Sequence, residues 1–203
     1  MLKVFLIRHG ETEWNVEGRF RGRCEISLSQ RGLEQAQRTA EALSSLRPAA
    51  LLSSPLKRCL QTAQPLADRF GLTIEPSEGL NDADFGEWSG LRREEVKGRW
   101  SSEFARWRSG DLSLRFPGGE SLNDAKERIA ALLRSLEKRF GEDDVVVCVT
   151  HQVPLKLMAC WLLGEAAFWR IHFEPASITV LRRTSRLWQV VTLGSAFHLE
   201  GLL

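Results

Sequence analysis

Two histidines each stand directly after a run of apolar residues that is typical of a buried strand. His9 follows Arg8 and the run from Val4 to Ile7. His151 follows the run from Val145 to Thr150. Runs without a polar face indicate strands covered on both sides. Ligands of open α/β sheets bind outside the carboxyl ends of the strands, so the two imidazoles would face each other there if these strands are neighbours.

Two arginines would add positive charge to the same sheet edge. Arg8 precedes His9, and Arg58 lies one turn inside the helix expected after "LLSSP". Such a cluster repels itself unless it holds a polyanion, and a planar guanidinium fits phosphate bidentately. Phosphoryl transfer to a histidine nitrogen accounts for the set: one imidazole attacks phosphorus while the other groups hold the charge on the equatorial oxygens. Either histidine or Arg58 alone is more often structural, so this prediction depends on all four residues.

The elements that must position these residues alternate between strand and helix along the chain. Ser29 can cap a helix whose apolar face would include Leu33 and Ala36. An alternating tail, "ASITVLRR" and "LWQVVTLG", predicts a hairpin at the sheet edge. This order predicts the α/β class, a three-layer α/β/α sandwich with a mostly parallel central sheet. Strands are expected at 3–7, 49–53, 72–76 and 143–150, and helices at 29–46, 56–70, 121–140 and 153–164.

The regular alternation breaks down between Ser77 and Gly119. This stretch contains "LNDADFGEWSG", then a short charged helical piece with several aromatic residues, then "FPGGES". An unstructured segment of that length is uncommon within a compact domain. We therefore expect one domain over residues 1–203, with a small helical lid insertion at about 77–119.

Composition excludes several classes of protein. The 28 basic and 26 acidic residues leave no broad electrostatic footprint for nucleic acid or an anionic membrane. The apolar segment "LMACWLLG" is too short to span a bilayer, and the opening apolar run is too short for a signal peptide. The four cysteines have no ligand spacing, and no HExxH pair is present. The sequence thus favours a cytoplasmic protein without a metal or another cofactor.

The stretch "LIRHGETEWN" resembles the signature of the histidine phosphatase superfamily, the phosphoglycerate mutase-like proteins. The resemblance covers nearly the whole chain, through "SLSQRGLEQAQ", "SSPLKRCLQTA", "DFGEWSG", "PGGES" and "VVCVTHQ". It implies that His9 is the nucleophile that becomes phosphohistidine. Arg8, Arg58 and His151 would bind the phosphoryl group, with Asn15 as an amide donor.

The position of the general acid departs from the family pattern. Where the family usually has a glutamate, this sequence has Asp82, in "NDADFG". Its shorter side chain must come closer to the leaving oxygen or act through a water. Asp84 is the rival, although a loop-capping role is its simpler interpretation. Neighbouring arginines would lower the pKa of Asp82 and favour an acidic optimum, whereas a dry lid and the bound phosphate would raise it.

Further departures concern substrate binding. The family commonly has glycine at the position of Gln152, whose side chain could narrow the pocket. In "EGRFRGRCE", Arg21 and Arg23 stand where the family more usually has an amide and a neutral residue. These arginines are either solvated surface charge or a rim that receives a second anionic group of the substrate. "SAFHLEG" resembles a segment that, in such phosphatases, brings a histidine to the substrate. That histidine is His198 here, and the alternative is that His198 belongs to a solvated tail. The predicted substrate-binding residues are Asn15, Arg21, Gly22, Gln152 and His198.

The length of the chain distinguishes between branches of the family. Only 23 residues separate Arg58 from Asp82, so the segment that the longer cofactor-dependent mutases add there is absent. The short form resembles alpha-ribazole phosphatase and metal-independent phosphoserine phosphatase. We therefore predict a phosphatase of a small phosphorylated metabolite, with homodimer formation left open. The alternatives are a phosphoglycerate mutase and a non-catalytic phospho-ligand binding protein.

Overall fold

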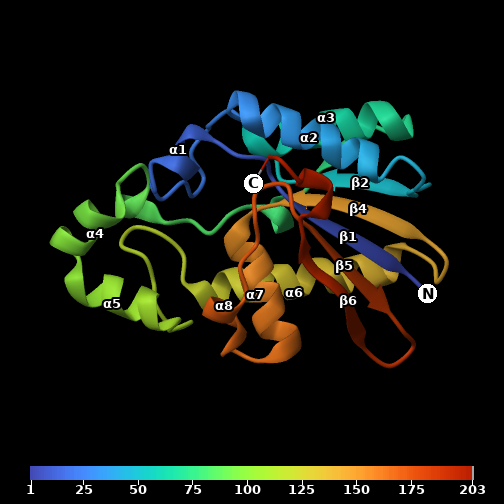
Figure 1. Ribbon diagram of the computed structural model, residues 1–203. Coiled ribbons are helices and arrows are strands. Elements are labelled where there is room, and N and C mark those ends of the chain that lie inside the picture. The colour runs from blue at the N-terminus through green and yellow to red at the C-terminus, as the bar shows by residue number, and fades with distance from the viewer. Residues whose placement is uncertain (203) are drawn as a thin grey trace.

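A single six-stranded sheet runs through the computed structural model, which describes residues 1–202 (Figure 1). The strand order is β3-β2-β4-β1-β5-β6. The first four strands in this order are mutually parallel, and β5 and β6 are added as antiparallel neighbours. The strands are β1 (Lys3–Arg8), β2 (Ala50–Ser53), β3 (Ile74–Pro76), β4 (Val145–Thr150), β5 (Ile178–Arg183) and β6 (Trp188–Ser195).

Helices cover both faces of the sheet. Helices α2 (Gln30–Ala42) and α3 (Lys57–Phe70) lie on one face, above the sheet in Figure 1, and α6 (Leu122–Arg139) and α7 (Gln152–Leu163) lie on the other. Side chains of a strand point alternately to opposite faces. In β1, Ile7 therefore joins the core under α2 and α3, whereas Leu6 joins the core under α6 and α7. The predicted three-layer arrangement with a mostly parallel sheet is confirmed.

Local sequence signals set the helix ends. The Ser29 side chain accepts a hydrogen bond from the Gly32 N–H and caps α2. Gly71 ends α3 at φ 66°, a left-handed conformation that glycine adopts without strain. Ser121 and Asp124 form the reciprocal capping box at the start of α6.

The buried face of α2 differs from the expected one at Leu33. Ala36 is buried as expected, but Leu33 is exposed, and the polar residues Gln35 and Thr39 complete the buried face. The reason lies in Gly32, where a Cβ atom would come within 2.1 Å of the Glu11 carbonyl oxygen. This close approach of α2 to the chain after His9 fixes the rotation of the helix about its axis and turns Leu33 toward solvent.

Residues 77–119 form a mostly helical cover beside the sheet. They contain the 3₁₀ turns η1 (Glu78–Leu80) and η2 (Gly86–Trp88) and the helices α4 (Arg93–Arg99) and α5 (Ser101–Ser109), which lie at the far left of Figure 1. Edge-to-face contacts join the cover to the loop after β1, with ring centroids 4.8 to 6.0 Å apart among Phe20, Phe85, Trp88, Trp107 and Phe116. The short elements α1 (Glu13–Val16), α8 (Ala167–Arg170) and η3 (Phe197–Leu199) complete the fold.

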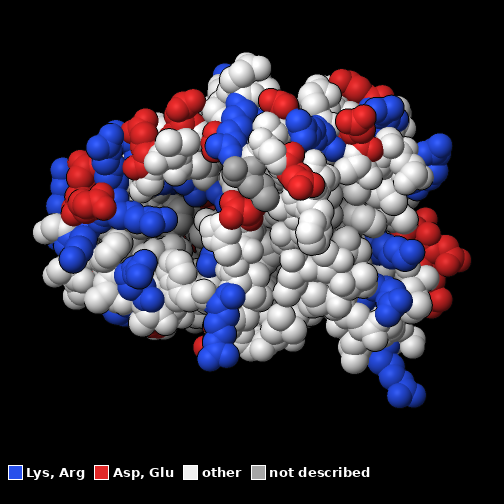
Figure 2. Space-filling view, viewed as in Figure 1, with Lys and Arg blue, Asp and Glu red and all other residues white. Residues whose placement is uncertain are grey.

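The surface is mixed in charge. Figure 2 shows basic and acidic side chains interspersed over α1, α2 and α4, and a mostly uncharged area over α7 and β5. Such interspersion agrees with the small net charge of +2. Within residues 1–202, no helix combines the length and apolar character needed to cross a membrane.

Candidate active site

The carboxyl ends of β1 and β4 bring the two predicted histidines together. The strands are parallel neighbours with Arg8 paired opposite Thr150, and the His9 N–H donates to the Thr150 carbonyl at 2.8 Å. The rings of His9 and His151 meet edge to face with their centroids 5.2 Å apart. Both residues are fully buried. The expectation that two neighbouring strands would deliver two facing imidazoles is confirmed.

The ring of His9 is held with one nitrogen free. Its Nδ1 lies 2.7 Å from the Gly10 carbonyl oxygen, which can only accept, so Nδ1 carries the proton. Its Nε2 is buried and has no hydrogen-bond partner among the described residues. Burial, followed by the charges of Arg58 and Arg8, holds the pKa of His9 well below its usual range. A neutral imidazole with a free, unprotonated Nε2 has the form that a nucleophile requires.

Arg58 enters the cluster from the first turn of α3 and is fully buried. Its guanidinium donates to the carbonyls of Gly22 at 2.6 Å and Cys24 at 2.8 Å, and its Nε donates to His151 Nδ1 at 3.2 Å. Gly22 has φ +48°, which turns its carbonyl toward Arg58 in a conformation that favours glycine. The loop after β1 thus fixes the direction of this guanidinium.

His151 is a second neutral imidazole. Its Nδ1 accepts from Arg58, so its Nε2 carries the proton and lies 2.9 Å from the Ser54 hydroxyl oxygen. Burial and then Arg58 hold the pKa of His151 well below its usual range. The neighbouring Cys59 is no rival nucleophile, because burial raises the pKa of its thiol far above neutrality.

Arg8 completes the positive charge around the histidines. It is 3% exposed, its Nη1 donates to the Phe173 carbonyl at 2.5 Å, and its buried Nε has no partner within residues 1–202. Burial, together with the charge of Arg21, lowers the pKa of Arg8 to about 9. Buried polar groups are normally satisfied. A free acceptor on His9 beside a free donor on Arg8 therefore fits an electrophilic centre that carries anionic oxygens.

The two acidic residues in "NDADFG" have different surroundings. Asp82 is 3% exposed, with Oδ2 3.4 Å from Arg58 Nη2 and 3.9 Å from His151 Nδ1. Asp84 accepts from the Gly86 N–H at 3.0 Å, which is the loop-capping role. Although Arg58 and Arg21 act in the opposite direction, burial raises the pKa of Asp82. Of the two opposing effects expected from the sequence, burial therefore prevails, because desolvation of the carboxylate outweighs the attraction of the arginines.

The predicted substrate-binding residues divide into two groups. Asn15, Arg21 and Gln152 line a cavity together with Arg8, which we name the anion cavity after its arginines. Two carboxylates, of Glu11 and Glu174, also line it, and they lie 3.8 Å from Arg31 and 3.2 Å from His172. The side-chain oxygen of Asn15, Oδ1, accepts from the Thr12 N–H at 2.9 Å and from the Thr12 hydroxyl at 2.7 Å, which leaves the amide NH₂ as the free end of the side chain.

Three other residues lie elsewhere. Gly22 holds Arg58 and does not line the anion cavity, and Arg23 lies 3.5 Å from Glu120 in a surface ion pair. His198, in η3, packs against α2, where its Nε2 is 3.0 Å from the Thr39 hydroxyl. His198 does not line the anion cavity. Part of its ring surface is covered, which lowers the pKa of His198.

Sequence reasoning missed several residues next to this cluster. His172 lines the anion cavity and lies 3.2 Å from Glu174, and Arg93 reaches the same cavity from α4. Lys156 is 5% exposed on α7 and donates to the Phe168 carbonyl at 2.7 Å. A charged residue at a helix start, as in "LRREE", is typical of a solvated surface, so no local signal distinguished Arg93.

A free imidazole nitrogen with arginines around it, at the carboxyl edge of a mostly parallel sheet, defines a histidine-based phosphoryl-transfer enzyme. The family comparison agrees with this class. The chain belongs to the histidine phosphatase superfamily (branch 1), whose family model matches residues 4–196. The sequence-based predictions of the family and of a phosphatase are thereby confirmed.

Three similar proteins illustrate this relationship. Phosphoserine phosphatase 1 of Hydrogenobacter thermophilus is 36% identical over 98% of this chain and 95% of its own length. A probable phosphoglycerate mutase, GpmB, of Salmonella paratyphi C is 31% identical over 99% and 96%. The crystal structure of phosphoserine phosphatase from Entamoeba histolytica in complex with 3-phosphoglyceric acid is 30% identical, with a TM-score of 0.88 over 98% of this chain and 100% of that chain.

The buried neutral histidines make stability depend on pH. Their folded pKa values lie below the ordinary value of 6.5, so below pH 6.5 the unfolded chain binds protons that the folded chain does not. We expect stability to fall as pH drops below 6.5, by up to about 1.4 kcal/mol per pH unit for each histidine. Asp82 acts in the opposite direction, because its folded pKa is raised.

Urea unfolding at pH 7.5 and 5.5, in buffer without phosphate, measures this dependence. His9→Asn should reduce the loss of stability between the two pH values, because one of the two histidines is then removed. Equal stability of the unmodified protein at both pH values would contradict the assignment of neutral imidazoles.

Proposed function

We propose that the protein hydrolyses a small phosphomonoester through a phosphohistidine formed on His9. The free, buried Nε2 of His9 among Arg8, Arg58 and His151 carries this proposal. Phosphoserine phosphatase relatives support the substrate class, a small phosphorylated metabolite.

The reaction follows from the roles of five side chains. His9 Nε2 attacks phosphorus, and the guanidiniums of Arg8 and Arg58 hold the charge on the equatorial oxygens with His151. The bond from phosphorus to the leaving oxygen breaks as Asp82, whose raised pKa favours the acid form, donates a proton to that oxygen. Water then attacks the phosphohistidine and gives its proton to the Asp82 carboxylate. Inorganic phosphate leaves, and His9 is free again.

A mutase is the second candidate, because GpmB-type relatives are also similar to this chain. A mutase must retain the phosphohistidine and return the phosphoryl group to its substrate, whereas a phosphatase needs only water. The 23 residues between Arg58 and Asp82 leave no room for the added segment of the longer mutases, although GpmB-type relatives match this chain over nearly its whole length. We favour hydrolysis because the phosphoserine phosphatase relative has the higher identity, 36% against 31%.

Product analysis tests the proposal. With 3-phosphoglycerate and other phosphomonoesters, we expect release of inorganic phosphate, with no 2-phosphoglycerate formed with or without 2,3-bisphosphoglycerate. Release should survive dialysis against a strong chelator, because guanidiniums and imidazoles supply the charge stabilisation that a divalent ion gives in other enzymes. Isomerisation that depends on the bisphosphate would favour the mutase, and activity restored only by a metal ion would contradict the metal-free mechanism.

Partners and compartment stay predictions. A reducing cytoplasm agrees with four free cysteines, three of them buried, and self-association into a homodimer awaits a measurement of mass in solution. Neither property enters the proposed chemistry.

A further inference from the structure

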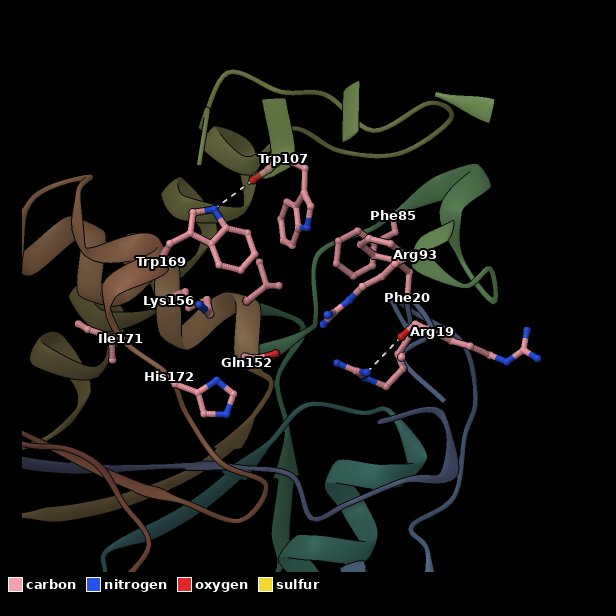
Figure 3. A pocket seen from close by; sticks show the side chains of 13 residues that line it. Arg19, Phe20, Phe85, Arg93, Trp107, Gln152, Lys156, Trp169, Ile171 and His172 are labelled. Atoms are coloured by element: carbon pink, nitrogen blue, oxygen red, sulfur yellow. Dashed lines mark hydrogen bonds between the residues drawn. The ribbon is translucent and has the colours of Figure 1, made fainter. Parts of the chain in front are cut away.

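A second cavity, of about 320 Å³, adjoins the anion cavity (Figure 3). Arg21, Arg93, Gln152 and His172 line both. Away from these shared residues the second cavity is walled by aromatic rings, above all Trp107 and Trp169 in Figure 3, so we name it the aromatic cavity. Its volume is within the range of ligand pockets. A group attached to a phosphoryl in the anion cavity would extend into it.

The aromatic cavity is positively charged. Within residues 1–202, its lining contains no carboxylate and includes the cations Arg21, Arg93 and Lys156. Arg19 also lines it, but the Arg19 guanidinium is bonded to Glu17 and to the Gly90 carbonyl. Positive charge that lines a concave, low-dielectric wall attracts an anion.

The two arginines keep donors available. Arg21 donates a hydrogen bond from Nη1 to the Arg19 carbonyl at 3.1 Å, and its buried Nε has no partner within residues 1–202. Arg93 is exposed, and its guanidinium points into the cavity in Figure 3, where no bond joins it to another side chain drawn. Arg21 and Arg93 lie together at the boundary of the two cavities, since both residues line both. Burial lowers the pKa of Arg21 to about 10, while the Asp82 carboxylate acts against this lowering and the charges of Arg58 and Arg93 add to it.

Two contacts orient the aromatic wall. Trp169 Nε1 donates to the Trp107 carbonyl at 3.1 Å, and the Lys156 ammonium lies 4.5 Å from the centre of a Trp169 ring. Trp169 nevertheless stays 42% exposed. A fixed indole face of this kind suits a planar or apolar part of a ligand.

We propose that the leaving group of the substrate occupies the aromatic cavity and carries a second oxyanionic group, which Arg21 and Arg93 bind together. This inference rests on the proposed phosphatase function. The Lys156 ammonium uses one of its three N–H donors on the Phe168 carbonyl and adds positive charge to the cavity beside the two arginines. The substrate class is then a phosphomonoester whose alcohol bears a carboxylate or a second phosphate beside a planar or apolar portion.

A pair of aryl phosphates tests the inference. 4-Carboxyphenyl phosphate carries the second anion, and phenyl phosphate has the same ring without it. We expect Arg93→Met to lower the ratio of kcat/KM for the carboxylated ester over the uncharged ester about tenfold, the size of one lost charge-assisted contact. The matched control is Arg92→Met, which removes the preceding, exposed arginine that pairs with Glu17 at 3.5 Å and does not line the cavity.

Each outcome of this experiment either supports or overturns the proposed subsite. A ratio unchanged in Arg93→Met, or one that falls equally in Arg92→Met, overturns the subsite. A fall of this ratio in Arg93→Met but not in Arg92→Met, with partial recovery of the ratio in Arg93→Lys, supports the subsite. Absence of phosphate release from both esters with the unmodified protein would instead overturn the proposed phosphatase function, so the two failures are distinguishable.

Discussion

His9→Ala is expected to lower phosphatase turnover by about 10⁴-fold or more, the range seen when a covalent nucleophile is removed from an enzyme. His9 supplies the free Nε2 of the cluster, and the other imidazole nitrogens are engaged: His151 Nδ1 accepts from Arg58, and His151 Nε2 meets Ser54. Steady-state phosphate release measures the loss. A rapid alkaline quench of the unmodified protein with labelled substrate should trap a phosphoryl-enzyme that is stable in base.

The fold should survive this substitution. The imidazole of His9 makes one polar contact, with the Gly10 carbonyl, so its removal leaves no buried charge unpaired. Circular dichroism and thermal unfolding provide the control. An active His9→Ala protein, together with no trapped intermediate in the unmodified protein, would exclude the covalent mechanism.

Asp82→Asn is expected to slow hydrolysis of an alkyl phosphate by about 10²–10⁴-fold, because general acids contribute that much when an alkoxide leaves. Hydrolysis of p-nitrophenyl phosphate should lose far less, since nitrophenolate leaves without a proton. Burial raises the pKa of Asp82, so the acid form persists to higher pH than in an exposed aspartate. The alkaline decline of the alkyl phosphate rate should therefore begin at higher pH than the usual aspartate range.

Asp84→Asn is the matched control for this experiment. An asparagine there keeps the oxygen that accepts from the Gly86 N–H and caps the loop, so both substrates should be turned over nearly normally. If Asp82→Asn reduced both rates equally, Asp82 would be a positioning residue for Arg58 and His151. If Asp84→Asn showed the selective loss, Asp84 would be the acid.

Much of the fold could be predicted because its signals are local. Apolar runs gave the strands before His9 and His151, and Ser29, Gly71 and Ser121 set helix ends within their own turns. Parallel pairing then placed both histidines at one edge, which is a property of the topology and not of a single residue.

What escaped prediction depends on contacts between distant segments. Leu33 was assigned to the core because its spacing suits a helix face, but the contact of Gly32 with Glu11 sets the rotation of that helix. Arg93 lines the anion cavity because the start of α4 lies beside the loop after β1, where Arg92 pairs with Arg19 in a β-bridge. The pKa of Asp82 depends on a burial that its neighbours in sequence do not reveal.

The aromatic residues of the cover also determine how this protein emits light. It has seven tryptophans and no tyrosine, so its fluorescence on excitation beyond the phenylalanine absorption band comes from indole rings alone. Trp88 and Trp100 lie 6.5 Å apart between ring centroids, and Trp107 and Trp169 lie 5.4 Å apart. More than half of the fluorophores are therefore gathered in or against the cover, two of them in the wall of the aromatic cavity. The molecule carries a built-in optical reporter for whatever occupies that cavity, which makes its ligands accessible to titration without a chromogenic group.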